Sequence, residues 1–309
     1  MTTSERELRE QICEVGRRLY NKGFAAANDG NISIRLNERE ILCTPTGVSK
    51  GFMKPDDCCV VDYQGKQLRG VKKRTSEILL HLTAYRDNPK VMGVVHCHPP
   101  HATAFAIAHE PIPKCILPEV EVFLGEVPIA EYETPGTQKF AETISPYVKD
   151  SSIVILANHG TIAFSKDLMT AYFNTEILDA YCKMLILARQ LGRINFFTEQ
   201  QTKELLEFKK RLGIDDPRLK GENCDMCSNN MLRPGYSDFL PNAYAFPEWD
   251  QSKLTQHIAH SSQPTANSQK LTADSTQLTA CNEKATPSNA SLERLVQAIT
   301  DQVMAAMKA

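Results

Sequence analysis

The stretch VMGVVHCHPPHATAFAIA, residues 91–108, joins an apolar strand pattern to a pair of histidines and then to a short helix pattern. Side chains two positions apart lie on the same face of a strand, so His96 and His98 are predicted side by side, with Cys97 in the core. Pro99 and Pro100 end the strand. Two adjacent neutral imidazoles suit a divalent transition metal, although two core or surface histidines would give the same pattern.

A third histidine strengthens the metal hypothesis. VILANHG places His159 at the end of a second apolar strand, just before Gly160. Side chains at strand ends leave the packed interior, and sites gather there. Three histidines with one open position are typical of a catalytic metal site. We interpret His81 and His101 as structural or supporting residues, and His257 and His260 as solvated.

Helix and strand patterns alternate irregularly through residues 1–212. An amphipathic helix opens the chain, and GNISIRL, EILCTPTG and DCCVVDYQG read as strands. TSEILLHLTAYRDNP predicts a helix that begins near Thr75 and stops before Pro89, and a long helix ends at Gly192. This irregular mixture indicates an α/β sandwich rather than a regular βαβ repeat.

The composition excludes several classes of protein. The 309 residues allow one domain of about 200–250 residues with an appendage. A formal net charge of −2 gives no electrostatic reason to expect nucleic acid or a membrane as partner. No apolar run approaches the about 20 residues that span a bilayer, and the opening segment lacks the apolar core of a signal peptide. We therefore expect a cytoplasmic protein.

The ten cysteines are scattered, and most lie in apolar runs. Reduced cysteines there behave as small hydrophobes, so we expect no disulfide framework. Cys224 and Cys227 form a CxxC pair, but no second CxxC or nearby histidine completes a zinc site.

The pattern changes after residue 212. Residues 213–257 are rich in Pro, Gly and Asn but retain aromatic residues, so we expect an irregular extension packed on the domain. Residues 258–290 have the composition of a disordered linker. Residues 291–309 predict an amphipathic helix that is marginal alone and needs a partner. Folding back onto its own domain is the alternative to docking elsewhere.

A catalytic site also needs an acid or base, and Glu77 opens the helix before the histidine strand. Its carboxylate has either a helix-start role or a place beside the metal. NDGNIS (28–33), TPTGVSKG (44–51) and RTSE (74–77) are turns whose N–H groups and hydroxyls can hold a phosphate. Each taken alone is equally an ordinary turn.

Together, GNIS, TPTG, TSE, VVHCHPPH and NHG, in this order, resemble the class II aldolase/adducin family. The resemblance covers residues 5–212. It implies a three-layer α/β/α sandwich with a central, mainly antiparallel sheet, usually assembled as a homotetramer. It further implies cleavage of L-fuculose 1-phosphate or L-rhamnulose 1-phosphate to dihydroxyacetone phosphate and lactaldehyde.

The resemblance also implies roles for individual residues. It suggests His96, His98 and His159 as ligands of one zinc ion per subunit and Glu77 as the catalytic glutamate. The positions that match the family's phosphate-binding residues are Asn28, Gly30, Asn31, Thr46, Gly47, Thr75 and Ser76. The tail resembles encapsulation peptides that bind shell proteins of bacterial microcompartments, which implies a location inside such a compartment.

Three alternatives remain within this family. Sugar-phosphate 4-epimerases, of the L-ribulose 5-phosphate type, generally have an aspartate where Glu77 stands. A thiosugar-phosphate dehydratase shares the fold, and adducin-like scaffolds lack the metal histidines. The chain departs from the aldolases in IPKCILPEVEVFLGEVP, which has no tyrosine to protonate the aldehyde oxygen. Glu119 or Glu121 lies in that stretch, and Tyr236 or Tyr244 is a further candidate.

Overall fold

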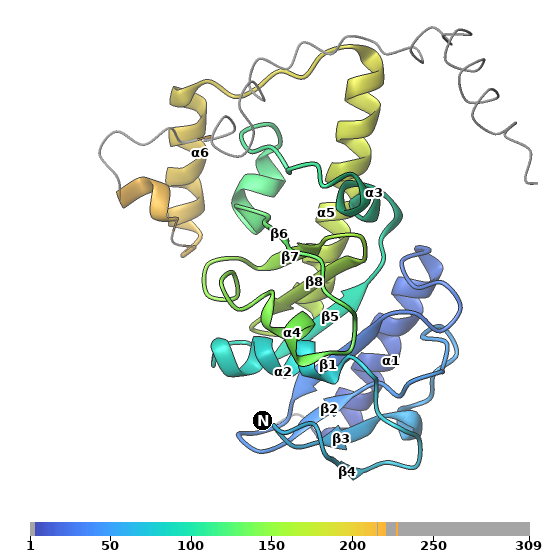
Figure 1. The fold of residues 1–309 in the computed structure, drawn as a ribbon. Coiled ribbons are helices and arrows are strands. Elements are labelled where there is room, and N and C mark those ends of the chain that lie inside the picture. The colour runs from blue at the N-terminus through green and yellow to red at the C-terminus, as the bar shows by residue number, and fades with distance from the viewer. Residues whose placement is uncertain (1–3, 215, 221–226, 228–309) are drawn as a thin grey trace, which may run out of the picture. The chain divides into compact units, whose positions relative to one another are not determined.

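A computed structural model of the chain describes residues 4–214, 216–220 and 227, which form a mixed sheet covered by helices (Figure 1). The sheet order is β4-β3-β2-β1-β5-β8-β7-β6, with only the β6–β7 pair parallel. The strands are β1 (Asn31–Arg35), β2 (Ile41–Cys43), β3 (Cys59–Val61), β4 (Gln67–Arg69), β5 (Gly93–Cys97), β6 (Ile129–Ala130), β7 (Ile153–Leu156) and β8 (Gly160–Ser165). The predicted, mainly antiparallel sheet is confirmed.

Alternation along the strands supplies two separate apolar cores. On β5, Val94 enters one core and Val95 the other, while on β2 Ile41 and Leu42 divide in the same way. Successive strand side chains point to opposite faces, so a strand with apolar residues at every position is buried on both sides. The sheet is therefore the middle of three layers, as predicted.

The helices complete the outer layers. The core on one face includes residues of α1 (Glu5–Asn21), α3 (Pro100–Ala108) and α5 (Leu168–Leu191). The core on the other face includes residues of α2 (Ile78–Asp87) and α4 (Gln138–Glu142), which lie side by side in Figure 1. α6 (Glu199–Arg211) begins at a Thr198 capping box, which the sequence interpretation did not single out. Short helical turns lie at Pro55–Asp57, Val120–Leu124 and Pro217–Lys220.

The start of α2 differs from the prediction by three residues. The Thr75 hydroxyl accepts a hydrogen bond from the Glu77 backbone N–H (3.3 Å), so residues 75–77 form a turn instead of the first helical turn. Helical structure begins at Ile78, with Glu77 as the N-cap residue. This turn places the Glu77 side chain next to β1 and β5 rather than over its own helix.

The cysteine prediction is wrong for one pair. Cys115 and Cys227 form a disulfide, with Cα atoms 5.7 Å apart. The two residues are far apart in sequence, and only the packing of the chain brings them together. Six other described cysteines are free and buried, as expected of small hydrophobic residues.

The predicted tail lies largely outside the described residues. Of the 213–257 extension, residues 213–214, 216–220 and 227 are described. Asp216 pairs with Lys209, and Arg218 pairs with Glu121. The predicted linker at 258–290 and the helix at 291–309 lie outside the described part, as do Cys224, Tyr236 and Tyr244.

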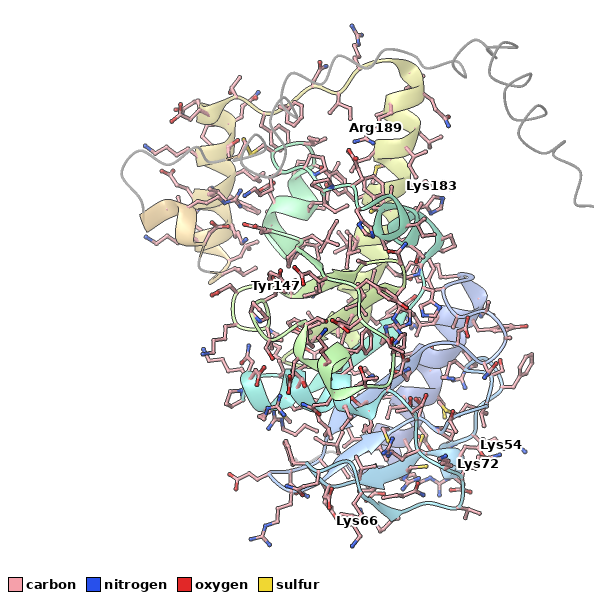
Figure 2. The ribbon with its side chains drawn as sticks, viewed as in Figure 1. Lys54, Lys66, Lys72, Tyr147, Lys183 and Arg189 are labelled. Carbon is pink, nitrogen blue, oxygen red and sulfur yellow. A yellow bond between two sulfur atoms is a disulfide. The ribbon has the colours of Figure 1, made fainter. Side chains whose placement is uncertain are left out.

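The surface near β3 and β4 carries exposed lysines, among them Lys54, Lys66 and Lys72 (Figure 2).

Within residues 4–214 and 216–220, no helix combines the length and apolar character needed to cross a bilayer.

Candidate metal centre and adjoining cavity

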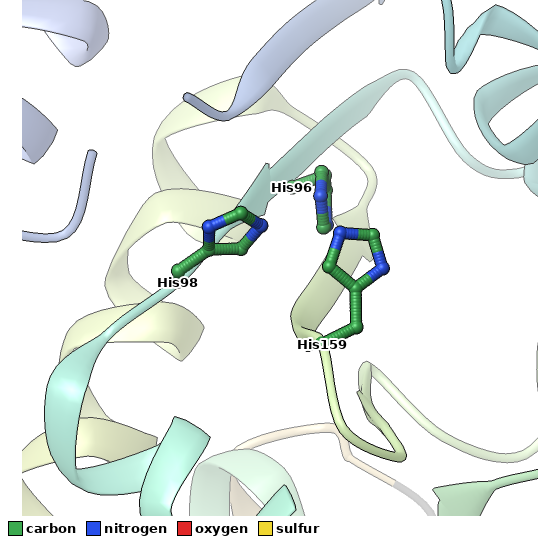
Figure 3. Close-up of side chains that lie close together, drawn as sticks. All are labelled: His96, His98 and His159. Atoms are coloured by element: carbon green, nitrogen blue, oxygen red, sulfur yellow. The ribbon is translucent and has the colours of Figure 1, made fainter. Parts of the chain in front are cut away.

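Three histidines converge where β5 ends and β7 turns into β8. His96 is on β5, His98 follows its last residue, and His159 lies in the β7–β8 turn. Figure 3 shows the three rings facing one another. Their centroids are 4.8–5.1 Å apart, and one nitrogen from each ring lies within 4.8 Å of the other two. The structure therefore brings together the three imidazoles that the sequence singled out.

The pairing of strands explains the convergence. β5 lies between β1 and β8, with Cys97 opposite Thr161 at the end of the β5–β8 ladder. The β7–β8 turn bends through Asn158, which has a left-handed backbone (φ 54°). The next residue, His159, is thereby directed to the end of β5.

The nitrogen atoms of these rings are arranged for a metal. His96 Nδ1–H donates to the Thr161 carbonyl oxygen (2.8 Å), which leaves Nε2 as the unprotonated nitrogen. Of the nitrogens that face the cluster (Figure 3), His96 Nε2 and His98 Nε2 are buried and have no hydrogen-bond partner. In Figure 3, the nitrogen of His159 that faces the other two rings is Nε2, which lies 3.6 Å from Glu77 Oε1. Buried polar atoms without partners are rare and point to a missing ligand. Three imidazoles arranged in this way fit a divalent transition metal.

The side chain of Glu77 lies beside this cluster and makes no capping hydrogen bond to α2. Its Oε2 is 3.3 Å from His96 Nε2, and its Oε1 is 3.6 Å from His159 Nε2. The Asn31 side chain donates a hydrogen bond to Oε2 (2.7 Å). Of the two positions left open by the sequence, the structure selects the place beside the histidines.

The charges of the cluster are strongly coupled. Burial alone would raise the pKa of Glu77, but the neighbouring His96, the Asn31 hydrogen bond and His159 lower that pKa well below its usual range. Burial, together with the neighbouring His96, lowers the pKa of His159 to about 4. Burial also opposes protonation of His96, yet Glu77 raises the pKa of that ring overall. A metal ion bound here would therefore compete with a proton for His96, and its affinity would fall at acidic pH.

A cavity of about 200 Å³ adjoins the histidines. All seven predicted phosphate-binding positions line it, together with Glu77, His98 and His159; the seven are Asn28, Gly30, Asn31, Thr46, Gly47, Thr75 and Ser76. Gly30 has a φ of 73°, and a Cβ there would lie 2.9 Å from the His96 carbonyl oxygen. Only glycine fits this close approach between the turn and β5. The structure thus gathers three separate turns around one space.

Three of the predicted phosphate positions differ in the exposure of their side chains. The Asn31 amide is buried and already bonded to Glu77 and His81, whereas Asn28 and Thr46 are exposed. Phosphate binding by Asn31 remains a prediction, because its side-chain amide already links His81 to Glu77.

The sequence interpretation missed Lys50. Its ammonium donates hydrogen bonds to the backbone carbonyls of Asn28 (2.9 Å) and Val48 (2.7 Å), and the residue is 1% exposed at the wall of the cavity. Burial lowers the pKa of Lys50 to about 8, against the favourable charges of Asp29 and Glu77. In the sequence, its position at the end of TPTGVSK, a predicted phosphate-binding turn, could have marked Lys50 as a candidate, although not as a buried one.

Replacing Lys50 with methionine tests this buried cation. Because its pKa is lowered from 10.5 to about 8 on folding, the unfolded chain binds more protons between those values. The free energy of unfolding of the parent, relative to K50M, is therefore expected to increase across this window by up to about 3 kcal/mol. Urea unfolding at about pH 7.5 and about pH 10 measures the change, with exposed Lys54→Met as control. Equal pH dependence in parent and K50M would contradict the assignment.

Other candidate residues lie elsewhere. His101 Nδ1 bonds to Asp179 (2.9 Å), which supports its structural interpretation. Glu121 accepts a hydrogen bond from the Cys115 N–H (2.6 Å) and pairs with Arg218 (2.7 Å). Neither Glu119 nor Glu121 is among the residues described as lining the cavity.

Comparisons with known proteins place this arrangement in context. The sequence profile described as "Class II Aldolase and Adducin N-terminal domain" matches residues 10–186. An L-fuculose phosphate aldolase of Methanococcus maripaludis is 34% identical over 182 residues, which covers 59% of this chain and 96% of that protein. A 3-oxo-tetronate 4-phosphate decarboxylase of Haemophilus influenzae is 31% identical over 201 residues, covering 64% and 95%.

A solved structure agrees with these relatives. The crystal structure of YgbL from Klebsiella pneumoniae, described with the alternatives aldolase, epimerase and decarboxylase, has a TM-score of 0.62 at 29% identity. It covers 66% of this chain and 100% of its own. The three-layer fold expected from the sequence is thus shared with these proteins.

Proposed function

Because this chain belongs to the class II aldolase/adducin family, we propose that it is a metal-dependent lyase that cleaves a deoxy-ketose 1-phosphate. The substrates would be L-fuculose 1-phosphate, L-rhamnulose 1-phosphate or both, and the products dihydroxyacetone phosphate and lactaldehyde. The observation that carries this proposal is the cavity of turn residues that opens directly onto His98, His159 and Glu77.

His96, His98 and His159 would hold the metal, with zinc as the proposed ion. When bound, a divalent cation supplies Lewis-acid stabilisation of the negative charge that develops on the substrate's oxygens. The Thr161 carbonyl holds His96 in the tautomer that leaves Nε2 free. Asp29 lies 3.5 Å from His98 Nδ1 and can fix that ring in the same way.

The turns would fix the phosphate end of the substrate. Thr46, Thr75 and Ser76 offer hydroxyls on the cavity wall, and Gly30 and Gly47 allow the backbone to approach closely. Lys50 adds a buried positive charge, which a phosphate would favour by holding it in its protonated form. Fixing the phosphate brings the bond to be cleaved to the histidine side of the cavity.

Glu77 would move the proton at carbon. In the condensation direction its carboxylate removes a proton from the hydroxymethyl carbon of dihydroxyacetone phosphate, and in the cleavage direction it returns that proton to the three-carbon enediolate. The lowered pKa of Glu77 keeps it ionised, as a base requires. The hydrogen bond from Asn31 holds one oxygen in place and leaves the other toward His159.

The experiment is an assay for dihydroxyacetone phosphate formed from each of the two ketose phosphates, with lactaldehyde measured in parallel. Equal amounts of the two products are expected. Inversion at C4 without cleavage would instead indicate the 4-epimerase alternative, and no reaction with metal-loaded protein would contradict the proposal.

Decarboxylation is a second candidate, supported by the similarity to 3-oxo-tetronate 4-phosphate decarboxylases. Loss of carbon dioxide from such a substrate would leave the same three-carbon enediolate, which Glu77 could protonate. Both reactions therefore yield dihydroxyacetone phosphate. Carbon dioxide release separates them from aldehyde release.

For the C-terminal part we propose the organisation predicted from the sequence: a catalytic domain (1–212), a packed extension (213–257), a linker (258–290) and a docking helix (291–309). The helix would bind shell proteins of a microcompartment and so confine the lactaldehyde product. The catalytic domain would assemble as a homotetramer.

Deletion of residues 288–309 tests the docking role. The truncated protein is expected to keep its kcat and KM in solution, because the cavity residues all precede residue 160. It should no longer co-purify with shell proteins when both are expressed together. Unaltered co-purification would contradict the docking role.

A further inference from the structure

A chain of buried polar side chains runs from the interior of α2 to Glu77. Tyr85 Oη is 2.8 Å from Ser33 Oγ, which is 2.7 Å from His81 Nδ1. His81 Nε2 contacts Asn31 Oδ1, and Asn31 Nδ2 donates to Glu77 Oε2 (2.7 Å). His81, Ser33, Tyr85 and Asn31 are each 3% exposed or less.

Two periodicities build this chain. Glu77, His81 and Tyr85 are spaced by four residues, which places them on one face of α2 and its cap. Asn31 and Ser33 are two apart on β1 and so share the face of the sheet that meets α2. Along the chain, polar side chains from α2 and from β1 therefore alternate, within an otherwise apolar layer.

The carboxylate of Glu77, at one end of the chain, fixes the direction of every hydrogen bond in it. An ionised Glu77 only accepts, so the Asn31 amide nitrogen faces it and the Asn31 oxygen faces His81. His81 must then donate from Nε2, which leaves Nδ1 to accept from the Ser33 hydroxyl. Ser33 in turn accepts from the Tyr85 hydroxyl. One assignment satisfies all five groups.

Burial keeps the histidine neutral, as this assignment requires. Desolvation, together with the nearby His96, lowers the pKa of His81 to about 3. A charged ring would have to donate from both nitrogens. The Ser33 hydroxyl would then accept from both Nδ1 and Tyr85, and its own proton would have no acceptor in the chain.

We propose that His81 is a positioning residue, held as its Nε2–H tautomer by Ser33 and Tyr85, which locks the Asn31 amide so that it aims the Glu77 carboxylate at the substrate carbon. The inference rests on the proton-transfer role proposed for Glu77. Hydrogen-bonded partners behind a reacting group usually affect activity by about 10–100-fold when removed.

The test compares five variants under metal-saturated conditions. His81→Leu removes the donor to Asn31, His81→Gln retains an N–H near the position of Nε2, and Ser33→Ala and Tyr85→Phe remove single hydroxyls. Thr83→Val is the matched control, because Thr83 is a buried hydroxyl of the same helix outside the chain.

His81→Leu is expected to lower kcat about 10–100-fold, with bound metal unchanged and KM changed less than about threefold. His81→Gln should recover part of that loss, Ser33→Ala and Tyr85→Phe should show smaller losses, and Thr83→Val should match the parent. A folded His81→Leu protein with parental kcat would overturn the proposal. Should His81→Leu not fold, parental kcat in both Ser33→Ala and Tyr85→Phe would overturn it.

Nitrogen-15 spectra of histidine-labelled protein supply a readout without substrate. The His81 signal is expected to show a neutral ring protonated at Nε2, and Ser33→Ala should shift it toward a mixture of tautomers. A His81 ring protonated at Nδ1 would overturn the inference. Because this spectrum needs no turnover, it decides the direction of the chain even if the ketose phosphates prove not to be substrates.

Discussion

Glu77→Gln is expected to bind metal normally and lose turnover by about 10²–10⁴-fold, the usual contribution of a general acid or base. Glutamine fits the same space and can still accept the Asn31 hydrogen bond through its amide oxygen. The three imidazoles are unchanged, and His96 Nε2 and His98 Nε2 remain without a hydrogen-bond partner. The substitution therefore removes the proton carrier alone, and steady-state kinetics with metal analysis measure both consequences.

The matched control is Glu38→Gln, which removes an exposed carboxylate that is not among the residues lining the cavity. It should match the parent in kcat and metal content. Parental turnover in Glu77→Gln would show that another group carries the proton. Loss of metal in Glu77→Gln would show instead that the carboxylate is needed to hold the ion.

His96→Ala is expected to lose metal and activity together. His96 is fully buried, and the Thr161 carbonyl oxygen accepts a hydrogen bond from its Nδ1, which holds the ring in place. Two imidazoles cannot provide the three protein ligands of a catalytic site. Metal analysis after dialysis and the dihydroxyacetone phosphate assay should both fall to background.

His101→Ala provides the comparison for this variant. It removes a histidine only three positions beyond His98, but one whose ring bonds to Asp179 rather than facing the cluster. It should retain its metal. Full activity of His96→Ala, or of chelator-treated metal-free parent protein, would contradict a catalytic metal at this position.

Local patterns were sufficient for several features of the site. His96 and His98 could be paired because the two-residue period of a strand is a property of the backbone itself. The end of the long helix at Gly192 was predictable because glycine is the residue that most often ends a helix with a left-handed backbone. Gly192 has this conformation (φ 97°). The phosphate turns were found through their resemblance to a family, since each turn alone looked ordinary.

Other features depended on contacts between distant segments. Nothing near Lys50 in the sequence indicates that its ammonium will be buried against the Asn28 carbonyl. The Cys115–Cys227 disulfide likewise depends on where the chain returns after α6. The Thr75 turn delayed the start of α2 because a side-chain hydrogen bond replaced a helical one.

The sequence by itself determined which strands are apolar on both faces and that His96 and His98 lie on the same face of one strand. These features depend only on the periods of two and about four residues that the backbone imposes. Tertiary structure alone decided that β5 pairs with both β1 and β8, which brings His159 to His96 and Asn31 to Glu77. The physical reason is that the strand order depends on how much apolar surface the two faces of the sheet bury against α1, α2 and α5. This free energy comes from contacts between distant segments, so it cannot be read from a short stretch of sequence.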